Sequence, residues 1–167
     1  MTRKILFWTV AALVIVVLAH FVIKEITMTE EDRVRSVLDS LISGIESNSG
    51  LVCQTRLMDN LSLDYAHRGE RTDITIDKAL AIRYLVGLKQ QSYADFQVEV
   101  RDIQITVTGE TARCVLTGRV TAALKDKPGE RVELLTVGGF NRAITDLAKN
   151  GDRWQVIASQ RIQHELK

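Results

Sequence analysis

The pattern of apolar and polar residues changes along the chain, and each change indicates a different kind of structure. From Ile5 to Ile23 the residues are almost all apolar, and this run contains no lysine, arginine, aspartate or glutamate. A helix of about 20 apolar residues spans the hydrocarbon layer of a bilayer. Residues 1–28 are therefore predicted to form a short cytoplasmic stub, a transmembrane anchor over about residues 5–23, and a linker.

Two alternatives to a retained anchor stay open. Arg3 and Lys4, followed by an apolar stretch and a small residue at Ala19, also fit a cleaved signal peptide, although the apolar run continues past that site. The run could instead form a buried helix of a soluble protein. For an anchor, the basic residues that precede it favour a cytoplasmic N-terminus. The domain at residues 29–167 is then expected to be extracytoplasmic.

Beyond the linker, apolar residues recur at intervals of three and four, which is the period of an amphipathic helix. The first predicted helix carries Val34, Val37, Leu38, Leu41, Ile42 and Ile45 on this face. Thr29 and Asp32 have the spacing of a capping box at its start, and "SNSG" from Ser47 ends it. Shorter helices are predicted over Leu51–Asn60 and Thr75–Gln91. In the last of these Thr75 is the expected cap, and one face carries Ile76, Leu80, Tyr84 and Leu88.

Elsewhere apolar and polar residues alternate, which is the period of a β-strand. Between the second and third helices, the strand face expected to look inward carries Leu61, Leu63, Tyr65 and His67. A long alternating pattern begins at Phe96. Its parity changes at Arg101-Asp102, because Val100 and Ile103 both belong to the apolar face. One extra residue, a β-bulge, is predicted there.

Three turn sequences divide this C-terminal part into four long strands. They are "TGET" from Thr108, "KDKPGE" from Lys125 and "KNGD" from Lys149, of which the last contains the Asn-Gly pair of a hairpin. Gly138-Gly139 indicates a bend or bulge. The final strand is predicted to place on one face Trp154, Val156 and Ala158. Helices first and strands last indicate an α+β domain, with a curved antiparallel sheet wrapped round three helices.

Charge and cysteine content narrow the classes of function. Two of the 22 basic residues precede Lys24, so the 20 basic and 21 acidic residues from Lys24 onward nearly balance. The basic residues do not cluster into a stripe that could bind phosphates, which argues against nucleic acid as a partner. Cys53 and Cys114 lack the paired spacing of a zinc site, and neither a metal nor a cofactor is expected. The two cysteines are either bridged in an oxidising compartment or buried as small apolar side chains.

The order of elements resembles the nuclear transport factor 2-like superfamily, whose cone-shaped α+β fold encloses a cavity with a curved sheet. The resemblance covers about Thr29 to Gln163. It rests on the first amphipathic helix, on "LSLDYAHRG" from Leu61, and on the closing hairpin "NGDRWQVIASQRI" from Asn150. A cystatin-like domain without a cavity is the alternative fold. The superfamily includes dehydratases, ketosteroid isomerases, polyketide cyclases and non-catalytic modules.

Candidate catalytic residues come from this resemblance and from residue chemistry. If the fold holds, Tyr65 and His67 lie near the cavity mouth, where a histidine suits acid–base work. Tyr84 is a further hydrogen-bond donor, and Asp102 or Asp146 a further acceptor. None matches a family active site residue by residue. Each candidate site also has a purely structural interpretation: an exposed strand end for His67, the surface for Asp64, Arg113 and Arg119, and the core for Tyr84 and Trp154.

Three functions suit such a domain. The preferred hypothesis is a membrane-anchored, non-catalytic binding or assembly module of an envelope complex, because assembly proteins of type IV secretion systems and proteins of lipid-transfer systems share this layout. Its partners would be proteins or a second copy, with Leu135 and Val137 adding apolar area to one sheet face. The alternatives are a cavity enzyme of isomerase, dehydratase or hydrolase type and a carrier of a small apolar ligand. An open apolar cavity of about 300 Å³ or more would favour a ligand.

Overall fold

A computed structural model describes residues 27–68, 75–127, 129–134 and 140–162. The predicted anchor at Ile5–Ile23 lies outside these residues, as do Leu135, Val137 and the pair Gly138-Gly139. Within the part of the chain that the structure describes, no helix is both long and apolar enough to cross a membrane.

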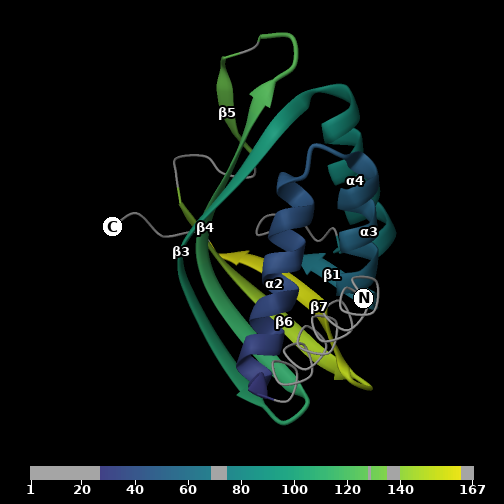
Figure 1. The fold of residues 1–167 in the computed structure, drawn as a ribbon, viewed down its shortest axis with the longest axis vertical. Helices are drawn as coiled ribbons and strands as arrows, with labels where there is room; N and C mark the ends of the chain where they lie inside the picture. Colours follow the sequence, from purple (N-terminus) through teal and green to yellow (C-terminus); the bar gives the residue numbers. More distant parts are fainter. Residues whose placement is uncertain (1–26, 69–74, 128, 135–139, 163–167) are drawn as a thin grey trace, which may run out of the picture.

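The described residues form an α+β fold of three helices and one seven-stranded sheet. The helices are α2 (Glu30–Glu46), α3 (Gly50–Asn60) and α4 (Lys78–Gln91). The strands are β1 (Leu61–Arg68), β2 (Thr75–Asp77), β3 (Tyr93–Thr108), β4 (Thr111–Leu124), β5 (Arg131–Leu134), β6 (Asn141–Asn150) and β7 (Arg153–Ile162). Figure 1 shows the sheet curving around α2, with α3 and α4 beside that helix.

The sheet is mixed rather than wholly antiparallel. Its strand order is β2-β1-β7-β6-β4-β3, and β5 pairs with β4. β1 and β7 run parallel, so the prediction of an antiparallel sheet is wrong at this pair. The reason is the connection: β1 reaches β7 through a helix and further strands, and only a hairpin would force neighbouring strands to run in opposite directions.

The first helix begins as predicted, and the third does not. The Thr29 hydroxyl accepts a hydrogen bond from the Asp32 amide at 3.1 Å, and the Asp32 carboxylate accepts one from the Thr29 amide at 3.0 Å. Thr75, the expected cap of α4, instead lies in β2, which pairs with β1. Asp77 caps α4, because its carboxylate accepts from the Leu80 amide at 2.8 Å. A carboxylate is among the preferred acceptors at this position.

Two contacts fix α2 against its neighbours. A Cβ on Gly44 would lie 2.7 Å from the Cβ of Arg56, so only glycine allows α2 and α3 to approach this closely. At the C-terminal end of α2, the buried Lys89 ammonium donates to the carbonyl oxygens of Ile45 and Ser47 at 2.5 and 2.9 Å. These bonds satisfy carbonyl groups that the end of a helix leaves without partners.

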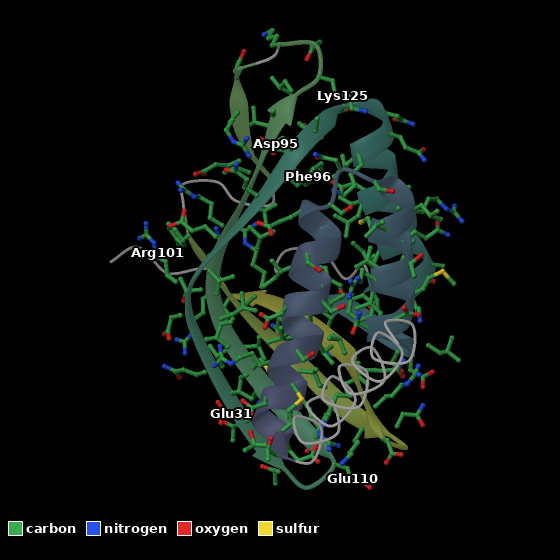
Figure 2. The ribbon with its side chains drawn as sticks, viewed as in Figure 1. Glu31, Asp95, Phe96, Arg101, Glu110 and Lys125 are labelled. Atoms are coloured by element: carbon green, nitrogen blue, oxygen red, sulfur yellow. The ribbon has the colours of Figure 1, made fainter. Side chains whose placement is uncertain are left out.

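Two bulges interrupt β3. The register with β4 shifts between Val100 and Asp102, which confirms the predicted bulge. A second shift lies between Ala94 and Gln97. There Asp95 has a φ of 47°, in the left-handed region, and Arg131 of β5 donates to the Asp95 carboxylate at 2.5 Å. Figure 2 shows Asp95 and Phe96 in the part of β3 that follows α4.

The core lies between α2, α3 and the concave face of the sheet. Its buried members are Val34, Leu38, Cys53, Leu57, Leu61, Ala112, Cys114, Leu147, Trp154 and Val156. Trp154 belongs to it as expected, and its indole N–H donates to the Glu30 carboxylate at 2.7 Å. The two cysteines are free and buried, so they are small apolar side chains and not a bridge. Burial raises the pKa of both thiols, that of Cys114 to about 11.

Candidate functional site

A cavity of about 320 Å³ lies between the three helices and the concave face of the sheet, and it is partly open to solvent. Most of its wall is aliphatic. The helices contribute Leu38, Leu41, Ile42, Ile45, Leu57, Ala81 and Leu85, and the strands contribute Leu61, Val98, Val100, Ile103, Leu116, Val120, Ala143 and Val156. The domain therefore encloses a space, as the nuclear transport factor 2-like resemblance implies and a cystatin-like domain does not.

The confirmed bulge in β3 shapes this wall. Val98, Val100 and Ile103 all line the cavity, although Val100 and Ile103 are separated by an odd number of positions. In a regular strand such residues would point to opposite faces. Because the bulge adds one residue, the apolar face stays turned toward the helices along the whole strand.

A further bulge in β7 brings polar groups into the cavity. Asp146 pairs with Ala158 and Leu147 pairs with Val156, which leaves Ile157 as the extra residue. Beyond it the parity is reversed, so Ser159 and Arg161 line the cavity together with Val156. The prediction that Ala158 shares the face of Trp154 and Val156 is therefore wrong, because it assumed a regular strand.

Ser159 joins two of the predicted site residues. Its hydroxyl oxygen lies 2.7 Å from the Tyr65 hydroxyl and 2.8 Å from Nδ1 of His67. Burial lowers the pKa of His67, which favours the neutral ring at neutral pH. A neutral ring protonated on Nε2 accepts from Ser159, whose oxygen then accepts from Tyr65. Burial also raises the pKa of Tyr65, while the bond to Ser159 acts in the opposite direction.

Arg161 is one of two arginines that line the cavity, and the other, Arg119 on β4, contacts Glu99 and Glu133. The Nε and Nη2 atoms of Arg161 donate to the side-chain oxygen of Asn141 at 2.9 and 2.5 Å, and both residues line the cavity. Thr145, which is buried and also lines the cavity, pairs across the strands with Ser159. One stretch of β6 and β7 thus contributes two hydroxyls, an amide and a guanidinium to a mostly aliphatic wall, to which Tyr65 and Arg119 also belong.

The structure does not unite the proposed catalytic trio. Tyr65 lines the cavity and His67 contacts its Ser159 partner, but Tyr84 is 53% exposed and is not part of the described wall. On α4 it is Ala81 and Leu85 that face the cavity. The predicted apolar face of this helix is therefore wrong, because Leu80 and Tyr84 both point to solvent. Their spacing is that of any helical face, including an exposed one.

The strand that carries Tyr65 and His67 is also less regular than predicted. The register of β1 against β7 shifts between Leu61 and Ala66. Leu61 is buried as expected, whereas Leu63 is 88% exposed, which corrects the expectation that it looks inward. Asp64 on the same strand is exposed, as its surface interpretation required. Asp102, the possible acceptor on β3, is exposed as well.

The other charged candidates lie in ion pairs of the sheet. Arg113 forms a two-point contact with Asp146 at 2.7 and 3.2 Å. Arg119 contacts Glu99 at 2.6 Å and Glu133 at 3.8 Å. The guanidinium of Arg101 stacks on the Phe140 ring, and Figure 2 shows Arg101 at the margin of the sheet, away from α2. Arg101 and Arg113 are therefore paired surface groups. Arg119 is paired through its terminal nitrogens but also lines the cavity, and its buried Nε has no hydrogen-bond partner among the described residues.

Ser159, Asn141 and Arg161 are site residues that the sequence pattern does not predict. The signal that could have found the first and last is the sequence "VIA" from Val156, in which three consecutive apolar residues break the alternation. The same kind of break reveals the bulge at Arg101-Asp102. Asn141 leaves no such signal, because its role depends on the position of Arg161 on the neighbouring strand.

The described residues contain no group of three histidine, cysteine, aspartate or glutamate side chains close enough to hold a metal ion. The polar groups of the cavity are instead hydrogen-bond donors and acceptors on neighbouring strands. They can orient the polar end of a bound molecule, while the aliphatic wall receives its apolar part.

Comparisons with known proteins identify the fold. No protein-family model and no curated protein matches the sequence. A nuclear transport factor 2-like superfamily protein from Salmonella enterica superposes with a TM-score of 0.63 at 11% identity, over 79% of this chain and 89% of that one. A nuclear transport factor 2-like protein from Cytophaga hutchinsonii gives 0.62 at 15% identity, over 82% and 100%. Hexachlorocyclohexane dehydrochlorinase LinA-type3 from Novosphingobium barchaimii gives 0.60 at 9% identity, over 78% and 83%.

Proposed function

We propose that this domain binds a small apolar ligand in the cavity between its helices and its curved sheet, and that the apolar run at residues 5–23 holds the domain at a membrane. The observation that carries the proposal is the cavity itself, about 320 Å³ with a mostly aliphatic wall. This volume lies within the range of small-molecule sites, which are mostly apolar with a few polar groups that fix orientation.

The nuclear transport factor 2-like fold of the described residues supports the same proposal. Proteins of this fold include an enzyme named for hexachlorocyclohexane, a small apolar molecule. In the present chain the residues of the cavity wall include three with hydroxyls, one with an amide and two with guanidinium groups. His67 reaches that wall only through Ser159. These groups suit binding and orientation, so we rank ligand binding above catalysis by His67, Tyr65 and Tyr84.

A neutral fluorescent probe, N-phenyl-1-naphthylamine, tests the proposal. The full chain in phosphatidylcholine nanodiscs should bind the probe saturably, after subtraction of the signal from empty nanodiscs. Ala143→Leu fills part of the cavity and should weaken binding about tenfold or more, because the added side chain takes the space of the ligand. Ala148→Leu is the matched control, since Ala148 lies on the opposite face of the same strand.

Equal probe binding by the original chain and both variants would overturn the proposal, provided that circular dichroism shows all three folded. The absence of saturable binding to the original chain would overturn it as well.

A second candidate function, a protein-binding or assembly module, is favoured by a separate observation. Every exposed large apolar side chain among the described residues belongs to α3, β1 or α4, which pack against one another. They are Leu51, Val52, Met58, Leu63, Leu80 and Tyr84. We name this set the α3–α4 face. Exposed apolar residues gathered on neighbouring elements are typical of a surface that contacts a partner, and the partner we propose is another protein of the same membrane.

A further inference from the structure

Two arginines line the cavity, Arg119 and Arg161, and only Arg161 lacks a carboxylate partner among the described residues. Arg113, Arg119 and Arg131 each contact a carboxylate, belonging to Asp146, Glu99 and Asp95 respectively. Arg161, within the described residues, is bonded only to the neutral side chain of Asn141. A guanidinium in mostly aliphatic surroundings is costly unless it is paired. The positive charge of Arg161 is therefore available to a bound molecule.

Asn141 holds this charge in place. Both of its bonds from Arg161 end on one oxygen, through Nε and Nη2. The guanidinium has five N–H donors in a fixed plane, so further donors remain for another acceptor. Because β6 and β7 are paired at this point, with Ala143 opposite Arg161, the group is fixed to the sheet and not to a loop.

The polar side chains that line the cavity next to Arg161 on β6 and β7 are uncharged. Ser159, two residues before Arg161, and its cross-strand neighbour Thr145 present hydroxyls to the same cavity. Hydroxyls bind both anions and neutral oxygens, whereas a guanidinium favours a planar anion that can take two parallel hydrogen bonds. Of the two arginines in the wall, Arg119 contacts Glu99 and Glu133, so Arg161 remains as the cation that matches a single negative charge.

We propose that the ligand is a small amphiphilic carboxylic acid, whose carboxylate meets Arg161 and whose hydrocarbon part fills the aliphatic remainder of the cavity. This inference rests on the proposed binding function and specifies its ligand class. The helix side of the cavity is lined by Leu38, Leu41, Ile42, Ile45, Leu57, Ala81 and Leu85 and contributes no polar side chain to the described wall. The hydrocarbon part therefore lies against the helices and the head group against β6 and β7.

Octanoate and octanol each have eight carbon atoms in a straight chain and differ in the head group, so comparing them tests the contribution of the head group. Each is used at pH 7 to displace N-phenyl-1-naphthylamine from the full chain in phosphatidylcholine nanodiscs. Octanoate should displace the probe at a lower concentration than octanol. In Arg161→Gln the order should reverse, because the carboxylate then loses its cation and still has to leave water. The ratio of the displacing concentrations of octanoate and octanol should change about tenfold or more between the original chain and Arg161→Gln. A hydrogen bond to a charged group contributes enough free energy to change an affinity about tenfold.

Two controls make the outcome specific. Arg142→Gln removes an exposed cation next to Asn141 and should leave the preference for octanoate unchanged. Arg161→Lys keeps the charge without the planar fork and should retain part of the preference, which serves as the informative variant if Arg161→Gln does not fold.

The results distinguish this inference from the function on which it rests. If the original chain binds the probe but octanol displaces it as well as octanoate, the head-group assignment is wrong and the apolar cavity function stands. The head-group assignment is equally wrong if Arg142→Gln abolishes the preference and Arg161→Gln does not. If the original chain does not bind the probe, both proposals fail together.

Discussion

His67 shows how one residue links the stability of the fold to its cavity. Its Nδ1 lies 2.8 Å from the hydroxyl of Ser159, which lines the cavity, and burial lowers the pKa of the ring. In the unfolded chain a histidine has a pKa near 6.5. At a pH between the lower pKa of the folded chain and the pKa of the unfolded chain, the His67 ring binds more protons in the unfolded state. The free energy of unfolding therefore increases with pH over this range. The contribution is fully present above about pH 6.5 and is lost as the pH falls through the folded value.

Urea unfolding followed by circular dichroism at pH 7 and pH 5 measures this effect. The original chain should lose more stability on acidification than His67→Asn, which keeps a polar group near Ser159 but does not titrate. The chain has two other histidines, His20 and His164, and both remain in the variant. The difference between the two proteins therefore isolates His67. Equal losses would show that the ring is not buried against Ser159.

Single residues also mark the limit of what the sequence can show. The pattern correctly places Tyr65 and His67 on a shared face, because both meet Ser159. Tyr84 is assigned by helical period alone, and the period does not say which face of a helix is buried. Arg161 and Asn141 meet across neighbouring strands. Their contact depends on strand pairing, which no local pattern reveals.

At the level of elements, alternation predicts a strand well and predicts its faces only while the strand stays regular. The bulge in β3 is visible because polar residues surround it, so that the change of parity is plain. The bulge in β7 lies within Val156, Ile157 and Ala158, which are all apolar. The apolar pattern is therefore equally compatible with a regular strand and with a strand that has one extra residue. The parallel pairing of β1 with β7 joins residues about 90 positions apart, so the local period carries no sign of it.

The α3–α4 face gives an element-scale prediction for the second function. Leu63 is 88% exposed, so Leu63→Glu should leave the free energy of unfolding within about 0.5 kcal/mol of the original value. If the face binds a membrane protein, chemical crosslinking in native membranes should give a discrete adduct that Leu63→Glu removes. Thr106→Glu, on the exposed side of β3, is the matched control and should keep the adduct. The same adduct from all three chains would contradict this use of the face.

For the molecule as a whole, the described helices and sheet form a nuclear transport factor 2-like fold with an apolar cavity. The proposed anchor would hold this domain at a membrane. A domain held beside a membrane meets amphiphilic molecules at high local concentration. The cavity, about 320 Å³ in volume, would receive them tail first along the helices, with the head group at Arg161. This arrangement explains why one concave surface combines an aliphatic wall with a guanidinium that lacks a carboxylate partner among the described residues.

Methyl NMR of the full chain in phosphatidylcholine nanodiscs, titrated with N-phenyl-1-naphthylamine, locates the bound probe within the domain. Because the probe is neutral, the result does not depend on the head-group assignment. We predict saturable shifts for methyl groups of Leu38, Leu85 and Val100, which line the cavity, and none for Ile144 on the opposite sheet face. Shifts confined to Leu51, Leu63 and Leu80 of the α3–α4 face, or no saturable shift at all, would contradict binding in the cavity.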